Sequence, residues 1–342
     1  MKYLQIGCGS ISGAWLSALS ARSDVEICGL VDVNIDSAAK RAMEYKLDCP
    51  VYDNLERAIA EQRPDVAIDN VLPEFRLEVA GKCLSSGIHV LSEKPLSDSM
   101  KNAKEIIRLS DEYNREFFVM QNRRYNCAML SFRDILKSGT VGNPGYLSAQ
   151  FFRESHFGGF RELMDSPLLI DMAIHTFDQA RYLLGKDPVS VYCKEYNTDY
   201  SWYKGNASAT CIFTFEDNII FNYSGSWSAP GTMDSYDSIW RAMCSKGTVT
   251  WNGLELPKAY ITDPETDQRH PRHMETSIDY TDCLVSGHAG CINEMIESLE
   301  AGRRSSTDCR DNIKSLAMVF AAVRSAKENR EVKIDEIMEV TI

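Results

Sequence analysis

Lys94 and its neighbours are the first candidates for chemistry in this sequence. The stretch GIHVLSEKPLS, residues 87–97, begins as an apolar run typical of a buried strand and ends in Glu93, Lys94 and Pro95. Burying a carboxylate and an ammonium group is costly unless the charges are paired or used. The simplest alternative is that Glu93 and Lys94 begin a solvated loop, so the interpretation depends on the elements around them.

A second group of polar residues lies on a mainly apolar segment, SPLLIDMAIHTFDQARYLLG, residues 166–185. Asp171, His175 and Asp178 stand there at positions i, i+4 and i+7. This spacing places the three side chains on one face of a helix. They could form the solvent-exposed polar face of an amphipathic helix, but such a face normally contains more polar residues around the helix. The narrow stripe therefore predicts side chains that line a cavity.

A glycine turn follows the first strand pattern. KYLQI leads into GCGSISG and then into the helix pattern AWLSALSA, which is the order that binds a dinucleotide pyrophosphate. Gly7 allows the tight turn and Gly9 allows the close approach of the cofactor, whereas Ser12 stands where a third glycine is common. We expect Gly7, Gly9, Ser10, Ile11 and Ser12 to bind the cofactor.

The second strand pattern, VEICGLVD, ends in Asp32, twenty residues after Ser12. A carboxylate at this place can accept hydrogen bonds from the adenosine ribose hydroxyls. Val33 and Asn34 follow it, rather than a basic residue that could neutralise a ribose phosphate. The sequence therefore predicts NAD rather than NADP, and we include Glu93, beside Lys94, among the cofactor-binding candidates.

Strand and helix patterns alternate through the first half of the chain. PDVAIDNV, IHVLSE and EFFVMQN are strand-like, and FRLEVAGKCLSSG and SMKNAKEIIRLSDEYN are helix-like. This alternation predicts an α/β fold with a parallel, doubly wound sheet. Ligands bind outside the carboxyl ends of the strands in such sheets. Lys94 would lie at one of these ends, facing the nicotinamide half of a dinucleotide.

The second half has a different pattern. Alternating runs predict antiparallel strands at VSVYCKEYN, ASATCIFTF, NIIFNYSGSWS, SIWRAMC and GTVTWNG, and helices at CINEMIESLEAG and DNIKSLAMVFAAVRSAKEN. We expect a dinucleotide-binding domain over residues 1–122. A domain for substrate binding and oligomerisation would cover residues 123–342, and its last helices could pack back on the first domain.

Composition narrows the classes of function. The 342 residues carry a net charge of −12, without a basic block, so no nucleic acid partner is expected. No apolar run is long enough to span a membrane, and the first residues lack a secretory signal pattern. The eleven cysteines are scattered singly with no C-x-x-C. This usage suits buried thiols rather than disulfides, and predicts a protein of the reducing cytoplasm.

Other polar residues are not assigned to the site. His270 with His273, and His288 with the cysteines around it, lack the four-ligand spacing of structural zinc, so no metal is expected. His288 is a modest candidate for the substrate pocket. Arg123 and Arg124 could contact cofactor or substrate, and an ion pair is an equal alternative.

Together these motifs resemble the glucose-fructose oxidoreductase and inositol dehydrogenase family (Gfo/Idh/MocA) over essentially the whole chain. The resemblance implies a Rossmann domain followed by an α/β domain with a large open, mainly antiparallel sheet. One side of that sheet would cover the active site and the other would mediate oligomerisation, so a homodimer or homotetramer is expected. The family's catalytic lysine, aspartate and histidine fall on Lys94, Asp171 and His175.

The resemblance also implies an activity, the NAD-dependent oxidation or reduction of a sugar, sugar derivative or cyclitol. Oxidising a secondary alcohol requires removal of its proton while hydride leaves the same carbon, and NAD accepts that hydride. His175 has a suitable pKa range for the proton. Lys94 would stabilise the alkoxide-like oxygen, and Asp171 would orient the imidazole or bind a neighbouring hydroxyl.

Two alternatives remain open at this point. One is an enzyme of the same family that keeps its NAD bound and oxidises a glycoside transiently in order to cleave it. The other is a sugar-sensing regulator with this fold and no chemistry. A sensor needs no base and electrophile together, so Lys94 and His175 favour an enzyme. The sequence does not separate the two enzymes.

Overall fold

The computed structural model describes residues 1–342 except 268, 279, 282, 284 and 340–342. This part of the chain forms two compact units. The first contains residues 1–122 and 285–316, and the second contains residues 123–284 and 317–339. The long helix α10, Cys309–Glu328, therefore begins in the first unit and ends in the second.

A six-stranded sheet forms the centre of the first unit. Its strand order is β3-β2-β1-β4-β5-β6, and every neighbouring pair is parallel. Because the order reverses direction between β1 and β4, this is a doubly wound sheet, as predicted. The strands are β1 (Lys2–Ile6), β2 (Glu26–Val31), β3 (Val51–Tyr52), β4 (Val66–Asp69), β5 (His89–Ser92) and β6 (Phe117–Val119).

Polar side chains set where several helices of this unit begin. Asn34 accepts a hydrogen bond from the N–H of Asp36 at the start of α2, Asn54 accepts one from Arg57 in α3, and Ser99 accepts one from Asn102 in α5. Each cap satisfies a backbone donor that the helix leaves without a partner. The helices are α1 (Ser12–Ser20), α2 (Ile35–Glu44), α3 (Leu55–Gln62), α4 (Arg76–Ser85), α5 (Met100–Glu112) and α9 (Gly287–Glu300), with 3₁₀ turns at Pro73–Phe75 and Asn122–Tyr125.

A nine-stranded sheet forms the second unit. Its order is β14-β13-β12-β11-β7-β10-β9-β8-β15, and only the β7–β10 pair is parallel among the described strands. This is the mainly antiparallel sheet that was expected. The strands are β7 (Pro144–Phe152), β8 (Pro188–Tyr196), β9 (Ser208–Phe215), β10 (Ile220–Ser226), β11 (Ile239–Cys244), β12 (Gly247–Trp251), β13 (Lys258–Thr262), β14 (His273–Glu275) and β15 (Val332–Lys333).

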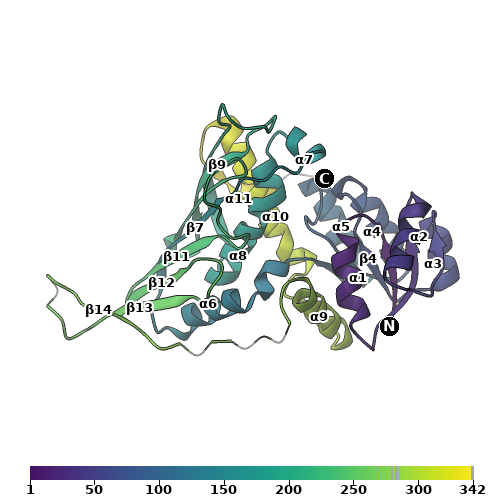
Figure 1. Cartoon of the computed structure of the whole chain (residues 1–342), viewed down its shortest axis with the longest axis horizontal. Helices are drawn as coiled ribbons and strands as arrows, with labels where there is room; N and C mark the ends of the chain where they lie inside the picture. The colour runs from purple at the N-terminus through teal and green to yellow at the C-terminus, as the bar shows by residue number, and fades with distance from the viewer. Residues whose placement is uncertain (268, 279, 282, 284, 340–342) are drawn as a thin grey trace. The chain divides into compact units, whose positions relative to one another are not determined.

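Helices α6 (Cys127–Ser138) and α8 (Ile174–Leu184) cover one face of this sheet (Figure 1). Phe177 of α8 packs edge-on against Phe213, with the ring centroids 4.8 Å apart, and against Tyr223 at 5.3 Å. On the opposite face, alternate residues of β8 and β11 stay exposed. The remaining helices of this unit are the short α7 (Phe160–Leu163) and α11 (Ile334–Met338).

One pair of cysteines differs from the expectation of free thiols. Cys127, at the start of α6, forms a disulfide with Cys283, 156 residues later, with their Cα atoms 5.5 Å apart. Pairing over such a distance depends on the fold and leaves no spacing signal in the sequence. The other nine cysteines are free, and seven of them are buried, as expected.

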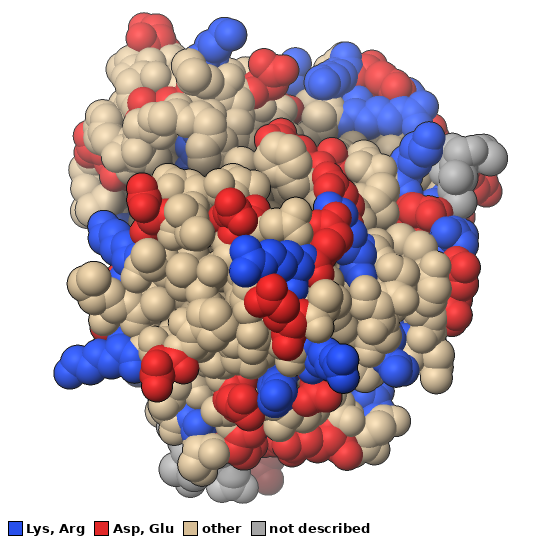
Figure 2. Space-filling model, turned by 90° about the vertical axis from the view of Figure 1, so that its right-hand side faces the viewer, with Lys and Arg blue, Asp and Glu red and all other residues tan. Residues whose placement is uncertain are grey.

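Two further properties bear on possible partners. Within the described part of the chain, no helix is both long and apolar enough to cross a membrane. On the face of the protein that Figure 2 shows, basic and acidic side chains lie interspersed, so this view contains no broad field of one charge.

Candidate functional site

The glycine turn lies beside a cavity of about 500 Å³ in the first unit. Its walls come from the carboxyl ends of β1, β2 and β4 and from α3 and α4, and they include Gly7, Gly9 and Asp32. The backbone of Gly7 has φ +81°, and a Cβ atom there would lie 2.8 Å from the carbonyl carbon and oxygen of Asn70. Only glycine fits this position.

Gly9 has the opposite surroundings. A Cβ atom at Gly9 would meet no atom within 4 Å, so the missing side chain leaves open space beside the turn. Ser12 begins α1, is fully buried, and its hydroxyl donates to the carbonyl of Gly9 at 2.7 Å. Serine thus replaces the third glycine without crowding the helix. Ser10 and Ile11 connect these residues and are exposed.

Backbone amides hold the Asp32 carboxylate in place. The N–H of Cys8 donates to Oδ2 at 2.7 Å, and the N–H of Asn34 donates to Oδ1 at 2.8 Å. Val33 beside it is 96% exposed. Arg41 of α2 also stabilises the glycine turn, because its Nη2 donates to the carbonyl of Gly9 at 2.9 Å. This residue was not identified from the sequence.

Glu93 is buried and connects helix α1 to the turn at Lys94 through hydrogen bonds. It accepts hydrogen bonds from Nε1 of Trp15 at 2.8 Å and from the backbone N–H of Lys94 at 3.1 Å, and Nε2 of His288 lies 3.5 Å away. Burial opposes the charge, but His288, Trp15 and Lys94 together hold the pKa of Glu93 below its usual value. Glu93 is not among the residues that line the 500 Å³ cavity.

A buried ion pair supports the turn that carries Lys94. Asp69, at the end of β4, accepts from Nε of Arg76 at 3.0 Å and from the Ser92 hydroxyl at 2.9 Å. Arg76 also donates to the backbone carbonyl of Pro95. The Lys94–Pro95 peptide bond is cis. Lys94 therefore follows β5 at the carboxyl edge of the parallel sheet, as predicted, on a turn fixed by polar contacts.

Asp171 and His175 lie in the second unit. Leu168–Ala173 is a π-helical turn that runs directly into α8, so Asp171 belongs to the π turn and His175 to the first turn of α8. Such turns are frequent at functional sites. The Asp171 carboxylate accepts from Nε of Arg161 at 2.9 Å and remains 20% exposed, whereas His175 is buried.

Asp178 corrects the predicted stripe. Nε and Nη2 of Arg124 donate to its two carboxylate oxygens, both at 2.6 Å, and both side chains are buried. This bidentate pair joins the segment after β6 to α8, so Asp178 has a structural role. The π turn that carries Asp171 ends before His175, so the i, i+4 spacing of these two residues does not correspond to a regular α-helical turn.

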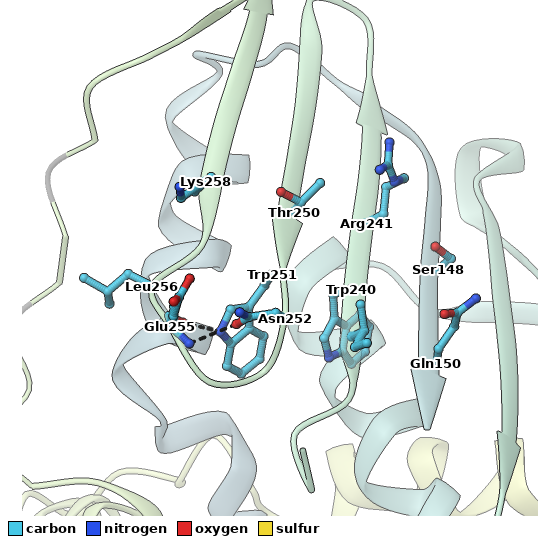
Figure 3. Close-up of a pocket in the computed structure, with 11 residues that line it drawn as sticks. Ser148, Gln150, Trp240, Arg241, Thr250, Trp251, Asn252, Glu255, Leu256 and Lys258 are labelled. Atoms are coloured by element: carbon cyan, nitrogen blue, oxygen red, sulfur yellow. Dashed lines mark hydrogen bonds between the residues drawn. The ribbon is translucent and has the colours of Figure 1, made fainter. Parts of the chain in front are cut away.

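A second cavity, of about 350 Å³, lies on the nine-stranded sheet (Figure 3). Its lining comes from β7, β11 and β12 and from the turn before β13, and includes Gln150, Arg241 and Asn252. None of the residues predicted to be functional lines it. Among the described residues, no group of three or more His, Cys, Asp or Glu side chains is placed to hold a metal ion.

Comparison with known protein families gives two matches. Residues 1–121 match the model described as "Oxidoreductase family, NAD-binding Rossmann fold", and residues 129–250 match the model of the GFO/IDH/MocA C-terminal domain. Together the two models cover the glycine turn, Asp32, Lys94, Asp171 and His175.

Similar proteins extend over nearly the whole chain. Myo-inositol 2-dehydrogenase of Thermotoga maritima is 23% identical and covers 97% of this chain and 98% of its own. D-apiose dehydrogenase of Paraburkholderia graminis is 24% identical, with coverages of 97% and 89%. A crystal structure of an oxidoreductase from Agrobacterium radiobacter in complex with NAD⁺, L-tartaric acid and magnesium has a TM-score of 0.86 at 18% identity, with coverages of 98% and 99%.

Proposed function

Because this chain belongs to the Gfo/Idh/MocA family of oxidoreductases, we propose that it is an NAD-dependent dehydrogenase of a sugar, sugar derivative or cyclitol. The observation that carries the proposal is the cavity of about 500 Å³ at the carboxyl ends of β1, β2 and β4. It combines a glycine turn with a carboxylate at the end of the second strand, which are the two features that a dinucleotide requires.

The residues of this cavity fit NAD. The open space beside Gly9 permits the pyrophosphate to approach the backbone, and the N-terminus of α1 follows the turn. Asp32 keeps lone pairs for the ribose hydroxyls, because each carboxylate oxygen receives one backbone N–H. We assign Gly7, Gly9 and Asp32, with Ser10 to Ser12, to cofactor binding. Glu93 contributes by holding Lys94.

Charge in the cavity favours NAD over NADP. A phosphate on the ribose would meet the Asp32 carboxylate, and exposed Val33 beside it offers no compensating charge. Lys82, the only lysine among the lining residues, is ion-paired to both Glu56 and Glu78 at 2.6 and 2.7 Å. It therefore supplies no net positive charge for a second phosphate.

Lys94, Asp171 and His175 are the proposed catalytic residues. NAD, when bound, accepts or supplies the hydride. His175 removes the proton from the substrate hydroxyl, and the Lys94 ammonium stabilises the negative charge that develops on the same oxygen. Asp171 orients His175 or binds a neighbouring hydroxyl. Lys94 belongs to the first unit, and Asp171 and His175 belong to the second.

The substrate class follows from the family and from the relatives' names. Two relatives that each cover 97% of the chain are called dehydrogenases of myo-inositol, a cyclitol, and of D-apiose, a sugar. Because nine of the eleven cysteines are free thiols, we also place the enzyme in the reducing cytoplasm.

A substrate screen of the purified protein tests this function. Sugars, cyclitols and chromogenic glycosides are offered with NAD, and NADH absorbance and aglycone release are followed together. Formation of NADH with at least one polyol is the expected result. Aglycone release without net NADH would instead identify a glycoside-cleaving enzyme. Binding of polyols without either product would identify a sensor.

A further inference from the structure

A group of arginines and aromatic rings adjoins the proposed catalytic residues of the second unit, and we call it the Tyr236 cluster. Its members are Arg123, Arg153, Phe157, Arg161, Trp227 and Tyr236. All six residues belong to the same compact unit as Asp171 and His175. Arg161 of this cluster contacts Asp171 directly.

The contacts within the Tyr236 cluster form a closed path that starts at Asp171. Arg161 pairs with Asp171 at 2.9 Å, and its guanidinium carbon lies 5.5 Å from the ring centroid of Phe157. The ring of Phe157 packs edge-on against Trp227 at 4.9 Å, and Trp227 lies 6.3 Å from Tyr236. This half of the path leads from the catalytic aspartate across three aromatic rings.

The second half of the path returns to the same place. The guanidinium of Arg123 lies 5.8 Å from the Tyr236 ring centroid, and its Nη2 contacts the sulfur of Met172 at 3.6 Å. Met172 is the residue directly after Asp171. The Tyr236 cluster therefore contacts the π turn that carries Asp171 at two points, through Arg161 and through Arg123.

Two guanidinium groups meet at the Tyr236 ring. Besides Arg123, Arg153 lies over this ring with its guanidinium carbon 3.9 Å from the centroid. Two cations beside one ring repel each other unless anionic groups are close. The chain supplies Asp237, whose carboxylate lies 3.6 Å from Arg123 and also accepts from the Asn126 side chain at 3.0 Å.

Both guanidinium groups have an unused donor. Nε of Arg123 and Nε of Arg153 are buried and have no hydrogen-bond acceptor within the described residues. Arg153 contacts Asp234 through the Asp234 backbone. Oδ2 of Asp234 accepts from the backbone N–H of Phe152, and Arg153 donates only to the Asp234 backbone carbonyl. A buried donor without a partner costs about 1–3 kcal/mol, and more when it is charged.

We propose that the substrate is a sugar acid or another polyol that carries a carboxylate, and that Arg123 and Arg153 bind this carboxylate beside Tyr236. This inference rests on the proposed function. Planar guanidinium groups match the geometry of a carboxylate, and charge-assisted hydrogen bonds are the strong ones. A monoanion fits better than a phosphate dianion, because Asp237 and Asp234 are close enough to repel the extra charge.

Matched pairs of substrates test the proposal. D-glucuronate, D-galacturonate and D-gluconate are compared with D-glucose, D-galactose and D-glucitol, using the full-length protein with NAD. We expect kcat/KM for the better acids to exceed that for their neutral partners by roughly 10- to 100-fold. Binding of each compound to the NADH-loaded protein is measured in parallel by calorimetry, which needs no turnover.

Variants show whether the arginines cause the preference. Arg153→Gln should raise KM for the acid by roughly 10-fold or more while changing kcat little, and Arg153→Lys should restore part of the loss. Because the Arg123 side chain is only 15% exposed, Arg123→Lys is used there, and circular dichroism checks that each variant folds. Arg330→Gln, in an exposed ion pair with Glu328, is the matched control and should behave as wild type.

The outcomes separate this inference from the proposed function. If kcat/KM for the neutral polyols equals that for the acids, the dehydrogenase assignment is supported and the carboxylate site is overturned. If acids bind and Arg153→Gln abolishes binding, but no compound is oxidised, the site stands and the dehydrogenase assignment fails. If acids bind no better than neutral partners, or bind equally well to Arg153→Gln, the site is overturned regardless of turnover.

Discussion

The indole Nε1 of Trp15 donates a hydrogen bond to Oε1 of Glu93 at 2.8 Å, which ties helix α1 to the turn that carries Lys94. Trp15 is fully buried and Glu93 is nearly so. The other oxygen of Glu93 accepts the backbone N–H of Lys94. The helix that follows the glycine turn thus helps to position the lysine, and the Glu93 carboxylate is hydrogen-bonded rather than solvated.

The Glu93 carboxylate should make stability depend on pH. Its pKa is lowered in the folded protein, so its contribution is fully present above the usual value of 4.5 and is lost as pH falls through the lower folded value. Urea unfolding between pH 7 and pH 3 should show this decline. Glu93→Gln should give a shallower decline and a lower free energy of unfolding at pH 7, by about 1–3 kcal/mol. A variant of the exposed Glu26, Glu26→Gln, should follow wild type, and an identical pH slope for Glu93→Gln would count against this role.

Asp32 should determine the choice of cofactor. The wild-type protein should bind NADH more tightly than NADPH, because the carboxylate held by Cys8 and Asn34 repels a ribose phosphate. Asp32→Ser should narrow the difference, mainly by improving NADPH binding. Titration of intrinsic fluorescence measures both affinities. Asp36→Ser, on the first turn of α2, is the control. Equal wild-type affinities for NADH and NADPH would contradict the role of Asp32 in cofactor choice.

The exposed face of the nine-stranded sheet should be an interface between copies of the chain. Tyr192 of β8, Ile212 of β9 and Met243 of β11 are 42%, 48% and 50% exposed on this face, and a monomer seldom leaves such an apolar surface uncovered. Light scattering at micromolar protein should give a dimer or tetramer. Ile212→Asp should shift the mass toward the monomer, whereas Met43→Lys, at an 81% exposed residue of α2, should not. A monomeric wild type would contradict the prediction.

Much of the fold could be predicted because its signals are local. The strand, the glycine turn and Asp32 lie within one stretch of sequence, and the alternation of strands and helices directly gives the parallel sheet. The antiparallel strands of the second unit were also visible as alternating runs. These are patterns of neighbouring residues, which depend little on the rest of the chain.

The contacts that hold the site could not be predicted in the same way. Trp15 lies 78 residues from Glu93, and Cys127 lies 156 residues from Cys283, so neither pair leaves a spacing signal. The α-helical spacing predicted for Asp171 and His175 also gave no sign of the π turn that precedes α8. Local patterns therefore identified which residues to examine, and the tertiary structure decided their partners.

Lys94 and His175 provide the most direct test of the mechanism. Both are proposed to act on one substrate oxygen, and neither lines the cavity at Gly7, Gly9 and Asp32 that is proposed to hold the adenine half of NAD. Lys94→Ala and His175→Asn should therefore leave NADH affinity nearly unchanged. Turnover of an identified substrate should fall by roughly two to four powers of ten for each variant.

The double variant distinguishes a shared role from two separate ones. Residues that act as a unit fail together, so Lys94→Ala combined with His175→Asn should lose little more activity than either single variant. Single-turnover kinetics with saturating NAD measure the chemical step for all three proteins, after circular dichroism has shown that each is folded. If folded Lys94→Ala oxidised the substrate at nearly the wild-type rate, Lys94 would have no part in stabilising the developing charge. The Glu-Lys-Pro turn would then be a structural connection between β5 and α5.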